Sequence, residues 1–103
     1  MMDGLEFDFE WDAVKAASNV IKHGVGFELA ASVMFDALAL TVFDEAHSQY
    51  EERWFTLGVS SNGQLLAVSH TFVTTGAATA TIRLISARQA TRLERKQYEE
   101  MPR

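Results

Sequence analysis

The chain has 103 residues, of which 48% are hydrophobic, and this length favours one folded domain, residues 1–103, with a modest core. The lack of cysteine excludes disulfides and thiolate chemistry, and the formal net charge of −5 counts against a protein that binds nucleic acid over its whole surface. Because the acidic N-terminal segment differs from a signal peptide and no apolar run reaches the ~18 residues of a membrane span, we expect a cytoplasmic protein that does not enter a membrane.

The first strand and helix are predicted by alternation and by capping residues. Residues 5–11, LEFDFEW, alternate apolar and acidic side chains, which indicates a strand with one buried and one solvated face. Asp12 is a good N-cap for a helix over residues 13–23, Gly24 suits the position after it, and the lysine and histidine of its last turn suit the helix dipole. Helical spacing predicts that this helix is buried through Val14, Ala17 and Ile21.

The next segment is predicted to contain a short helix, a strand and a loop. Residues 27–35 form the helix, which Asp36 ends, and the apolar run 37–43 predicts a buried strand. Residues 44–52 are polar and are expected to form a loop around His47. Acidic residues flank this histidine, but a second histidine or cysteine is missing, so a solvated loop is favoured over a metal site.

Residues 53–73 carry the strongest indication of a β-hairpin. Alternating apolar residues predict strands over residues 53–60 and 64–73, and Asn62-Gly63 between them is typical of a type I′ turn. His70 falls on the apolar face of the second strand. It is either a core histidine with a hydrogen-bond partner or a site residue at the strand's end, and the first alternative is the more common. The small residues 74–78 predict another turn.

The last strand and helix are predicted to meet within a few residues. β-branched residues favour a strand over residues 79–85, and Ser86 stands three residues before Gln89, the spacing of a capping box that opens a helix. Arg88 then lies in the first helical turn, where the helix dipole opposes a cation. It is either held there for an anion or is a solvated surface arginine. The apolar face of this helix would consist of Ala87, Ala90 and Leu93.

These elements give the order β-α-α-β-β-β-β-α. The later strands are consecutive and joined by short turns, so we expect a mostly antiparallel sheet. Packing the two N-terminal helices on one face of it gives a two-layer α+β fold that ends in a C-terminal helix.

Three motifs occur in order over residues 9–98. The first is FEWD with a lysine three residues later, followed by KHGV and a phenylalanine. The second is EER before a hydrophobic strand and a glycine, and the third is ISAR with an alanine two positions later. One of these blocks alone would be weak, but the three in register are specific. Together they resemble the BrnT toxin family.

The resemblance implies a function that the composition does not show. BrnT proteins are toxins of type II toxin–antitoxin pairs, have a fold similar to the RelE ribonucleases, and cleave RNA so that translation stops. The implied partner is a BrnA-like antitoxin with a ribbon-helix-helix part. A complex with two copies of each protein would repress its own promoter, so operator DNA is expected to be contacted only through the antitoxin.

The resemblance also implies a metal-free site that needs no cofactor. We expect the arginines to grip the phosphate with paired donors, and a histidine to move protons because this side chain titrates near neutral pH. The matching positions are catalytic His23, Arg53, His70, Arg83 and Arg88, and RNA-binding Lys15, Lys22 and Tyr98, with no metal ligand among them.

The chain departs from the family pattern in two places. Ala37 stands where proline is common, and HTFVTTGAATAT replaces a turn that commonly carries an arginine. A second hypothesis is therefore a binding module with weak or no catalysis that serves as antitoxin partner and co-repressor, with an acidic strand face for a basic partner at Glu6, Asp8 and Glu10. A metal-dependent hydrolase built on His47 and nearby acids is a distant third.

Overall fold

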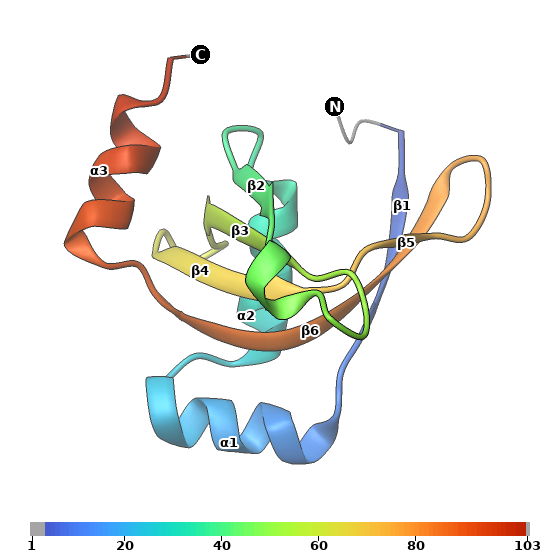
Figure 1. The fold of residues 1–103 in the computed structure, drawn as a ribbon. Coiled ribbons are helices and arrows are strands. Elements are labelled where there is room, and N and C mark those ends of the chain that lie inside the picture. Colours follow the sequence, from blue (N-terminus) through green and yellow to red (C-terminus); the bar gives the residue numbers. More distant parts are fainter. Residues whose placement is uncertain (1–3, 103) are drawn as a thin grey trace.

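The computed structural model describes residues 4–102, and Figure 1 shows how the helices and strands are arranged. Residues 1–3 and 103, the ends of the predicted domain, lie outside the described residues. In chain order the elements are β1 (Glu6–Glu10), α1 (Ala13–His23), α2 (Phe27–Ala31), the 3₁₀ helix η1 (Ser32–Phe35), β2 (Leu40–Phe43), the 3₁₀ helix η2 (Glu45–His47), β3 (Trp54–Val59), β4 (Leu65–His70), β5 (Val73–Thr74), β6 (Thr79–Gln89) and α3 (Arg92–Glu100). The predicted order of helices and strands is confirmed, and η1, η2 and β5 are added to it.

The strands form a mixed sheet in the order β1-β6-β4-β3-β2, with β5 pairing to one end of β6. β1 runs parallel to β6, whereas β6, β4, β3 and β2 follow one another in antiparallel pairs. The prediction of a mostly antiparallel sheet is therefore wrong. That prediction was based on the short turns between the later strands, and those turns do not specify which strand β1 pairs with.

The strand β6 is longer than predicted and takes up the segment assigned to the start of the last helix. Ser86 and Ala87 pair with Ser69 and Val68 of β4, so the chain stays extended through Gln89. The proposed capping box at Ser86 is thus wrong, because pairing across the sheet overrides a local capping pattern. Figure 1 shows β6 as the long curved strand that leads directly to α3.

The capping box that opens α3 lies five residues later than the predicted one. Thr91 Oγ1 accepts a hydrogen bond from the Glu94 backbone N–H at 3.1 Å, and Glu94 Oε1 accepts one from the Thr91 N–H at 2.9 Å. These two bonds satisfy backbone donors that the first helical turn leaves free. Arg88 therefore belongs to the strand, and the argument from the helix dipole does not apply to it.

A bulge in the pairing of β4 with β6 sets which side chains share a face. The register shifts between Ser69 and His70, so that β6 contains one residue more than the opposite strand. Leu84 and Ala87 are three positions apart, yet both are buried in the same core cluster. Side chains alternate on either side of a bulge, so Arg83 and Arg88 also share a face, the opposite one.

One face of the sheet is covered by α2 and η1. Phe27 and Val33 are buried there against Leu66 and Ile82, in the larger of two core clusters. A Cβ added to Gly58 of β3 would lie 3.2 Å from the side chain and carbonyl of Val33, which is a tight contact, so glycine favours this close approach of η1. The predicted packing of the early chain on one face is confirmed for this segment.

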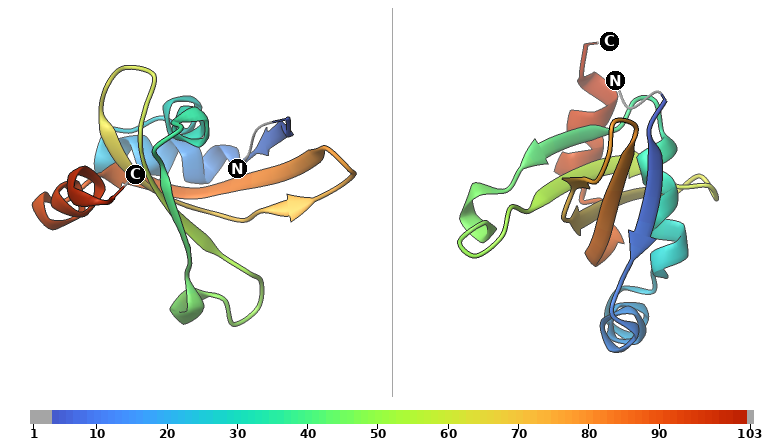
Figure 2. Two further views of the ribbon diagram at one scale, coloured as in Figure 1. Left: turned by 90° about the horizontal axis from the view of Figure 1, so that it is seen from above. Right: turned by 90° about the vertical axis from the view of Figure 1, so that its right-hand side faces the viewer.

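The other face is covered by the C-terminal helix. Leu57, Leu65 and Ala67 form a second buried cluster, and Ala90 and Tyr98 pack against it. Figure 2, viewed from above, places α3 beyond one end of β6 and the hairpin of β5 and β6 at the other end. The helices therefore lie on both faces of the sheet.

The hydroxyl of Tyr98 fixes α3 to the loop after η1. It donates to Asp36 Oδ2 at 2.6 Å, and the backbone N–H of Val59 donates to the same oxygen at 2.8 Å. The predicted apolar face of this helix is wrong: Leu93 is exposed, and Ala87 belongs to β6. Tyr98 supplies the packing instead, one turn further along the helix.

α1 has the predicted caps but not the predicted buried face. Asp12 Oδ1 accepts two backbone N–H groups of the first turn at 2.8 and 3.0 Å, and Gly24 ends the helix at φ 69°, in the left-handed region. Val14 and Ile21, however, are 79% and 87% exposed. Among residues 4–102, no helix combines the length and the apolar character needed to cross a membrane.

Asn19 explains why α1 does not turn its predicted apolar face towards the sheet. Its Nδ2 donates to the carbonyl oxygens of Ala87 and Val25 at 2.7 and 2.9 Å, and its Oδ1 accepts from the Ala87 N–H at 3.0 Å. The pairing of β1 with β6 stops at Arg83, so the edge of β6 beyond it lacks a neighbouring strand. The Asn19 amide supplies hydrogen-bond partners to the Ala87 backbone groups at that edge, and an apolar side chain is unable to do so.

Three further predictions about the strands are corrected. β2 is an exposed edge strand and not a buried one, with Val42 58% exposed. The β3–β4 turn is not type I′: Gly63 has φ 85°, but no non-glycine residue of the described chain has positive φ, which type I′ requires at both central positions. The predicted strand 64–73 is interrupted after His70, and β5 pairs separately with β6.

Candidate functional site

A pocket of about 400 Å³ lies on the face of the sheet that carries α3. It is bounded by the start of β3, the bulged part of β6, and the loop that contains η2. The residues that line it are Asp44, His47, Arg53, Phe55, Ser69, Ile85, Ser86 and Arg88. Ile85 and Ser86 are consecutive, and the bulge is what turns both towards the pocket.

Arg88 enters the pocket from β6 and is held from α3. Its Nη1 and Nη2 donate to the two carboxylate oxygens of Glu94 at 2.7 and 3.0 Å, and its guanidinium lies 5.9 Å from the centre of the Phe55 ring. The hydrogen bonds from Arg88 hold the pKa of Glu94 at about 2, and the same bonds raise the pKa of Arg88. This carboxylate is therefore ionised throughout the physiological pH range.

Arg53 and Arg83 meet at a second glutamate. Arg83 Nη2 donates a short hydrogen bond to Glu51 Oε1, and Arg53 Nη2 lies 3.6 Å from the same oxygen. The hydrogen bond from Arg83 lowers the pKa of Glu51. Within the described chain, Arg53 Nε is a buried donor that has no acceptor. Arg53 thus retains hydrogen-bonding capacity at the edge of the pocket.

The three predicted arginines are therefore brought together. Arg53 and Arg88 line one pocket, and Arg83 is linked to Arg53 through Glu51. Guanidinium groups remain charged and present paired N–H donors, so a cluster of this kind suits an anion with several oxygens, such as a phosphodiester. Their convergence depends on the bulge, which places Arg83 and Arg88 on the same face.

Of the two predicted histidines, neither lines the pocket. His23 is exposed at the end of α1. His70 is fully buried, with Nε2 2.7 Å from Thr56 Oγ1 and Nδ1 2.9 Å from the Thr71 carbonyl oxygen. Burial lowers the pKa of His70 and favours the neutral ring. Both ring nitrogens of His70 have hydrogen-bond partners inside the core. Of the two alternatives that the sequence left open, His70 is therefore the core histidine.

The predicted RNA-binding residues lie outside the pocket. Lys15 and Lys22 are exposed on α1. Tyr98 packs on the second core cluster with its hydroxyl on Asp36, and none of the three lines the pocket.

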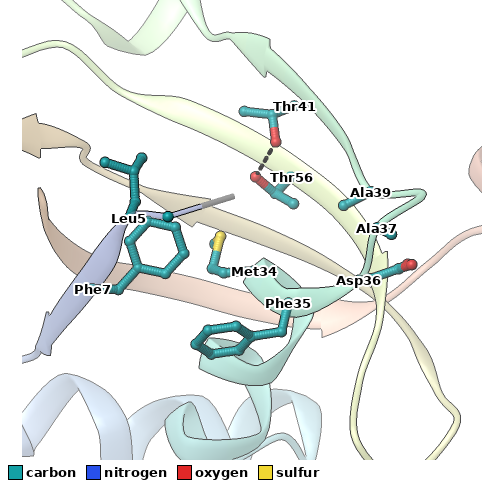
Figure 3. Close-up of a pocket in the computed structure, with 10 residues that line it drawn as sticks. Leu5, Phe7, Met34, Phe35, Asp36, Ala37, Ala39, Thr41 and Thr56 are labelled. Carbon is teal, nitrogen blue, oxygen red and sulfur yellow. Dashed lines mark hydrogen bonds between the residues drawn. The ribbon is translucent and has the colours of Figure 1, made fainter. Parts of the chain in front are cut away.

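A second pocket, of about 390 Å³, lies on the opposite face between β1, η1 and β2. Figure 3 shows Thr41 and Thr56 hydrogen-bonded to each other beside Met34 and the rings of Phe7 and Phe35. Among residues 4–102, no lysine, arginine or histidine contributes to its lining. This pocket lacks the charge that an anionic ligand requires.

No group of three or more histidine, aspartate or glutamate side chains gathers at metal-ligating positions in the part of the chain that the structure describes. His47 was weighed as a metal ligand in the sequence analysis. Its Nδ1 lies 2.9 Å from Asp44 Oδ2, within hydrogen-bond distance of one carboxylate. The arrangement of these side chains is that of a hydrogen-bonded pair.

Sequence reasoning missed two kinds of residue at this site. The first is His47, which was assigned to a solvated loop but lines the pocket. Its position just before the second family-like block, six residues before Arg53, was the available indication. The second kind is the acidic partners Glu51 and Glu94, which looked like ordinary surface acids. No sequence pattern indicates that they hold the arginines.

The fold and the pocket together define a small α+β protein with an arginine-rich, anion-compatible site on one face of a mixed sheet. The chain belongs to the BrnT family, because a family model described as "Ribonuclease toxin, BrnT, of type II toxin-antitoxin system" matches residues 11–94. The resemblance found in the sequence is thereby confirmed. Membership makes the chain a toxin-family protein of type II toxin–antitoxin systems.

A solved structure supports the fold. The 1.1 Å crystal structure of the Brucella abortus ribonuclease toxin BrnT is 22% identical, with a TM-score of 0.55, and the alignment covers 84% of this chain and 100% of that chain. At this level of identity the likeness concerns the fold alone. No curated protein matches the chain.

Proposed function

We propose that this chain is a cytoplasmic, metal-independent endoribonuclease toxin that arrests translation, built as one domain of the RelE-like class. Family membership supports the general class, and the arginine pocket supports the reaction. The observation that carries the proposal is the convergence of three arginines on one sheet face, with Arg53 and Arg88 in a single pocket.

The proposed reaction is attack of the ribose 2′-hydroxyl on the adjacent phosphorus. The 2′-oxygen–phosphorus bond forms, the phosphorus–5′-oxygen bond breaks, and the products are a 2′,3′-cyclic phosphate and a 5′-hydroxyl. Negative charge accumulates on the phosphate oxygens on the way. We propose that this charge is stabilised by Arg53, Arg83 and Arg88. Stabilising the charge of the transition state is the largest contribution that a preorganised cationic site makes to the rate. The need for a 2′-hydroxyl restricts the substrate to RNA.

Glu51 and Glu94 occupy the arginines when RNA is absent. Both glutamates are ionised at neutral pH, since their pKa values are lowered. A phosphate that enters the pocket is proposed to replace them on the guanidinium groups while Phe55 keeps Arg88 in place. Lys15, Lys22 and His23 on α1 are proposed to contact RNA beyond the pocket.

RNA cleavage by the purified protein tests the assignment. Total RNA is incubated with wild type, Arg83→Ala and Arg88→Ala in excess EDTA, which removes divalent metal ions. Arg95→Ala is the matched control, because Arg95 is an exposed α3 arginine whose ion pair with Glu99 is 3.8 Å long. We expect cleavage by wild type and Arg95→Ala, and a loss of about 10²–10³-fold in the other two. An inactive wild type, or equal rates in all four proteins, contradicts the proposal.

The proposed partner is a BrnA-like antitoxin with a ribbon-helix-helix part. Family membership in a type II system supports an antitoxin, which acts as a protein on the toxin. We propose a complex with two copies of each protein, in which the antitoxin alone contacts operator DNA. Co-expression with the product of the neighbouring reading frame, followed by measurement of the mass of the complex, checks the partner and the stoichiometry. Operator binding by the antitoxin alone, by the complex and by this chain alone checks which protein contacts DNA.

A co-repressor without strong catalysis is the second candidate function. Two observations favour it: Arg83 and Arg88 are already paired with glutamates, and residues 74–78, TTGAA, offer no cation near the strand end. Induction of the chain without its partner separates the two functions. A ribonuclease toxin arrests growth, and the arrest is lost in Arg88→Ala, whereas a co-repressor leaves growth unchanged.

A further inference from the structure

The pocket contains one hydrogen-bonded side-chain pair whose function is still unexplained. His47 and Asp44 both line it, and they are joined by the 2.9 Å contact between Nδ1 and Oδ2. The His47 side chain is 68% exposed and that of Asp44 23%. The imidazole is thus accessible from the pocket, while the carboxylate that holds it is mostly covered.

The contact determines which nitrogen of His47 carries the proton. A carboxylate in its ionised form only accepts hydrogen bonds, and Nδ1 is then the donor. In the neutral ring, Nε2 is then unprotonated and free to accept a proton. Histidine–carboxylate pairs with this geometry position a proton carrier in many enzymes.

The loop that carries the pair is tied to the segment that carries Arg53. The backbone N–H of Asp44 donates to the Arg53 carbonyl oxygen at 2.9 Å, and Ser48 Oγ donates to the Asp44 carbonyl oxygen at 2.6 Å. The N–H of Arg53 donates in turn to Ser48 Oγ at 2.9 Å. These bonds fix the position of His47 relative to an arginine of the proposed phosphate site.

The other lining residues are unsuited to moving a proton near neutral pH. The charged residues that line the pocket with His47 are Asp44 from its own loop, Arg53 before β3 and Arg88 on β6. Glu51 and Glu94 are bound to the arginines, and Glu45 lies on the same 3₁₀ helix as His47 without lining the pocket. Arginine stays protonated, and the hydroxyls of Ser69 and Ser86 do not titrate in this range. Asp44, the remaining charged lining residue, is hydrogen-bonded to His47 itself, so His47 presents the exposed proton-carrying group of the pair.

We propose that His47 is the proton-carrying catalytic residue of this site and that Asp44 is its positioning residue; this inference rests on the proposed ribonuclease function. His47 Nε2 accepts the 2′-hydroxyl proton as the 2′-oxygen bonds to phosphorus. As the bond to the 5′-oxygen breaks, that oxygen takes a proton from water in the open pocket. The imidazolium returns its proton to the hydroxide so formed, which regenerates the neutral ring.

Four substitutions test the assignment in the cleavage assay. His47→Ala and His47→Gln remove the proton carrier, and we expect each to lower the rate by about 10²–10⁴-fold. Asp44→Asn leaves the imidazole but removes the ionised acceptor, so an intermediate loss is expected. Glu45→Gln is the matched control: it removes one negative charge from the same turn, does not line the pocket, and should keep the wild-type rate.

Two further measurements separate catalysis from folding and from binding. Affinity for a fully 2′-O-methylated RNA, which lacks the nucleophile, should stay within about twofold of wild type in His47→Gln. The pH dependence of the wild-type rate should differ from that of the residual rate of His47→Ala, because the variant lacks the proton carrier.

These measurements distinguish a failure of the role of His47 from a failure of the proposed ribonuclease function. If the wild type cleaves RNA and both His47 variants cleave at a similar rate, the role of His47 is overturned and the proposed function stands. If His47→Gln loses affinity in proportion to its loss of rate, the residue is a binding residue and not a proton carrier, which also overturns the inference. A well-folded wild type that leaves RNA intact overturns the proposed function and this inference together.

Discussion

Arg88 and Glu94 form a bidentate ion pair across the junction between β6 and α3, with nitrogen–oxygen distances of 2.7 and 3.0 Å. Glu94 Oε1 also accepts the backbone N–H of Thr91 at 2.9 Å, as part of the capping box. One carboxylate therefore fixes both the start of a helix and the position of a pocket arginine. Changes at Glu94 should affect stability and ligand binding in opposite directions.

Replacement of Glu94 by glutamine is the first prediction. The loss of the charged partner should lower the free energy of unfolding by about 1 kcal/mol, because Arg88 is partly solvated and glutamine can still cap the helix. Under the proposed function, RNA affinity should rise on the order of fivefold, since Arg88 loses its anionic competitor. Urea unfolding and RNA titration measure the two effects.

Glu99→Gln is the control for this change. Glu99 lies on the same helix and pairs with Arg95 at 3.8 Å, with both side chains more than half exposed. Neither stability nor RNA affinity should change measurably. An equal response of the two variants would mean that the effect of Glu94 comes only from helix charge.

Stability at acidic pH is the second prediction. The pKa of Glu94 is about 2 in the folded protein and 4.5 is its usual value, so the folded state favours the ionised form. The resulting stabilisation is fully present above about pH 5 and is lost as the pH falls towards 2. The difference in unfolding free energy between wild type and Glu94→Gln should shrink over this window. A constant difference from pH 7 to pH 2.5 would contradict the assignment.

The buried His70 gives a third prediction in a different pH window. Burial lowers its pKa below the usual 6.5, so the folded state favours the neutral ring. This contribution is complete above about pH 6.5 and is lost as the pH falls below it, because the unfolded chain takes up the proton first. Unfolding free energy should decrease between pH 7 and pH 5 in the wild type.

His70→Gln removes the titrating group and should remove most of this decrease. Its cost in stability at pH 7 should be about 1–3 kcal/mol, because the buried hydrogen bonds of the imidazole to Thr56 and to the Thr71 carbonyl are lost. His23→Gln changes an exposed histidine and should keep the wild-type slope. Equal slopes in all three proteins would show that His70 does not account for the acid sensitivity.

Asn19 gives a fourth prediction, which reverses the expectation from helical spacing. Asn19→Ala should lower the unfolding free energy by about 2–3 kcal/mol, because the buried N–H and carbonyl of Ala87 lose their partner. Ile21→Ala changes a side chain that is 87% exposed and should cost less than about 0.5 kcal/mol. A larger cost at Ile21 than at Asn19 would contradict this packing of α1.

The parts of the fold that follow from neighbouring residues were predictable. Asp12 and Gly24 mark the ends of α1 because capping depends on a few adjacent backbone groups. The alternation of residues 5–11 gives a half-buried strand with its acids outside, since side chains in a strand point to opposite faces in turn. The family motifs are equally local, and they led directly to the class of protein.

The predictions failed where distant segments compete with a local pattern. Ser86 has the spacing of a helix cap, but pairing with Ser69 keeps the chain extended. Val14 and Ile21 have the spacing of a buried helix face, but the unpaired edge of β6 requires the amide of Asn19. In both cases backbone hydrogen bonds to a remote strand outweigh a weak helical preference.

By itself, the sequence determined the ends of α1, the order of the strands and helices, the family, and the three arginines proposed for the site. Only the tertiary structure decided that Arg83 and Arg88 share a face, because that depends on one extra residue at the bulge opposite β4. It also decided that His47 lines the pocket and that His70 is sealed in the core. Residue types are fixed locally, but their convergence is set by strand register, which no short segment specifies.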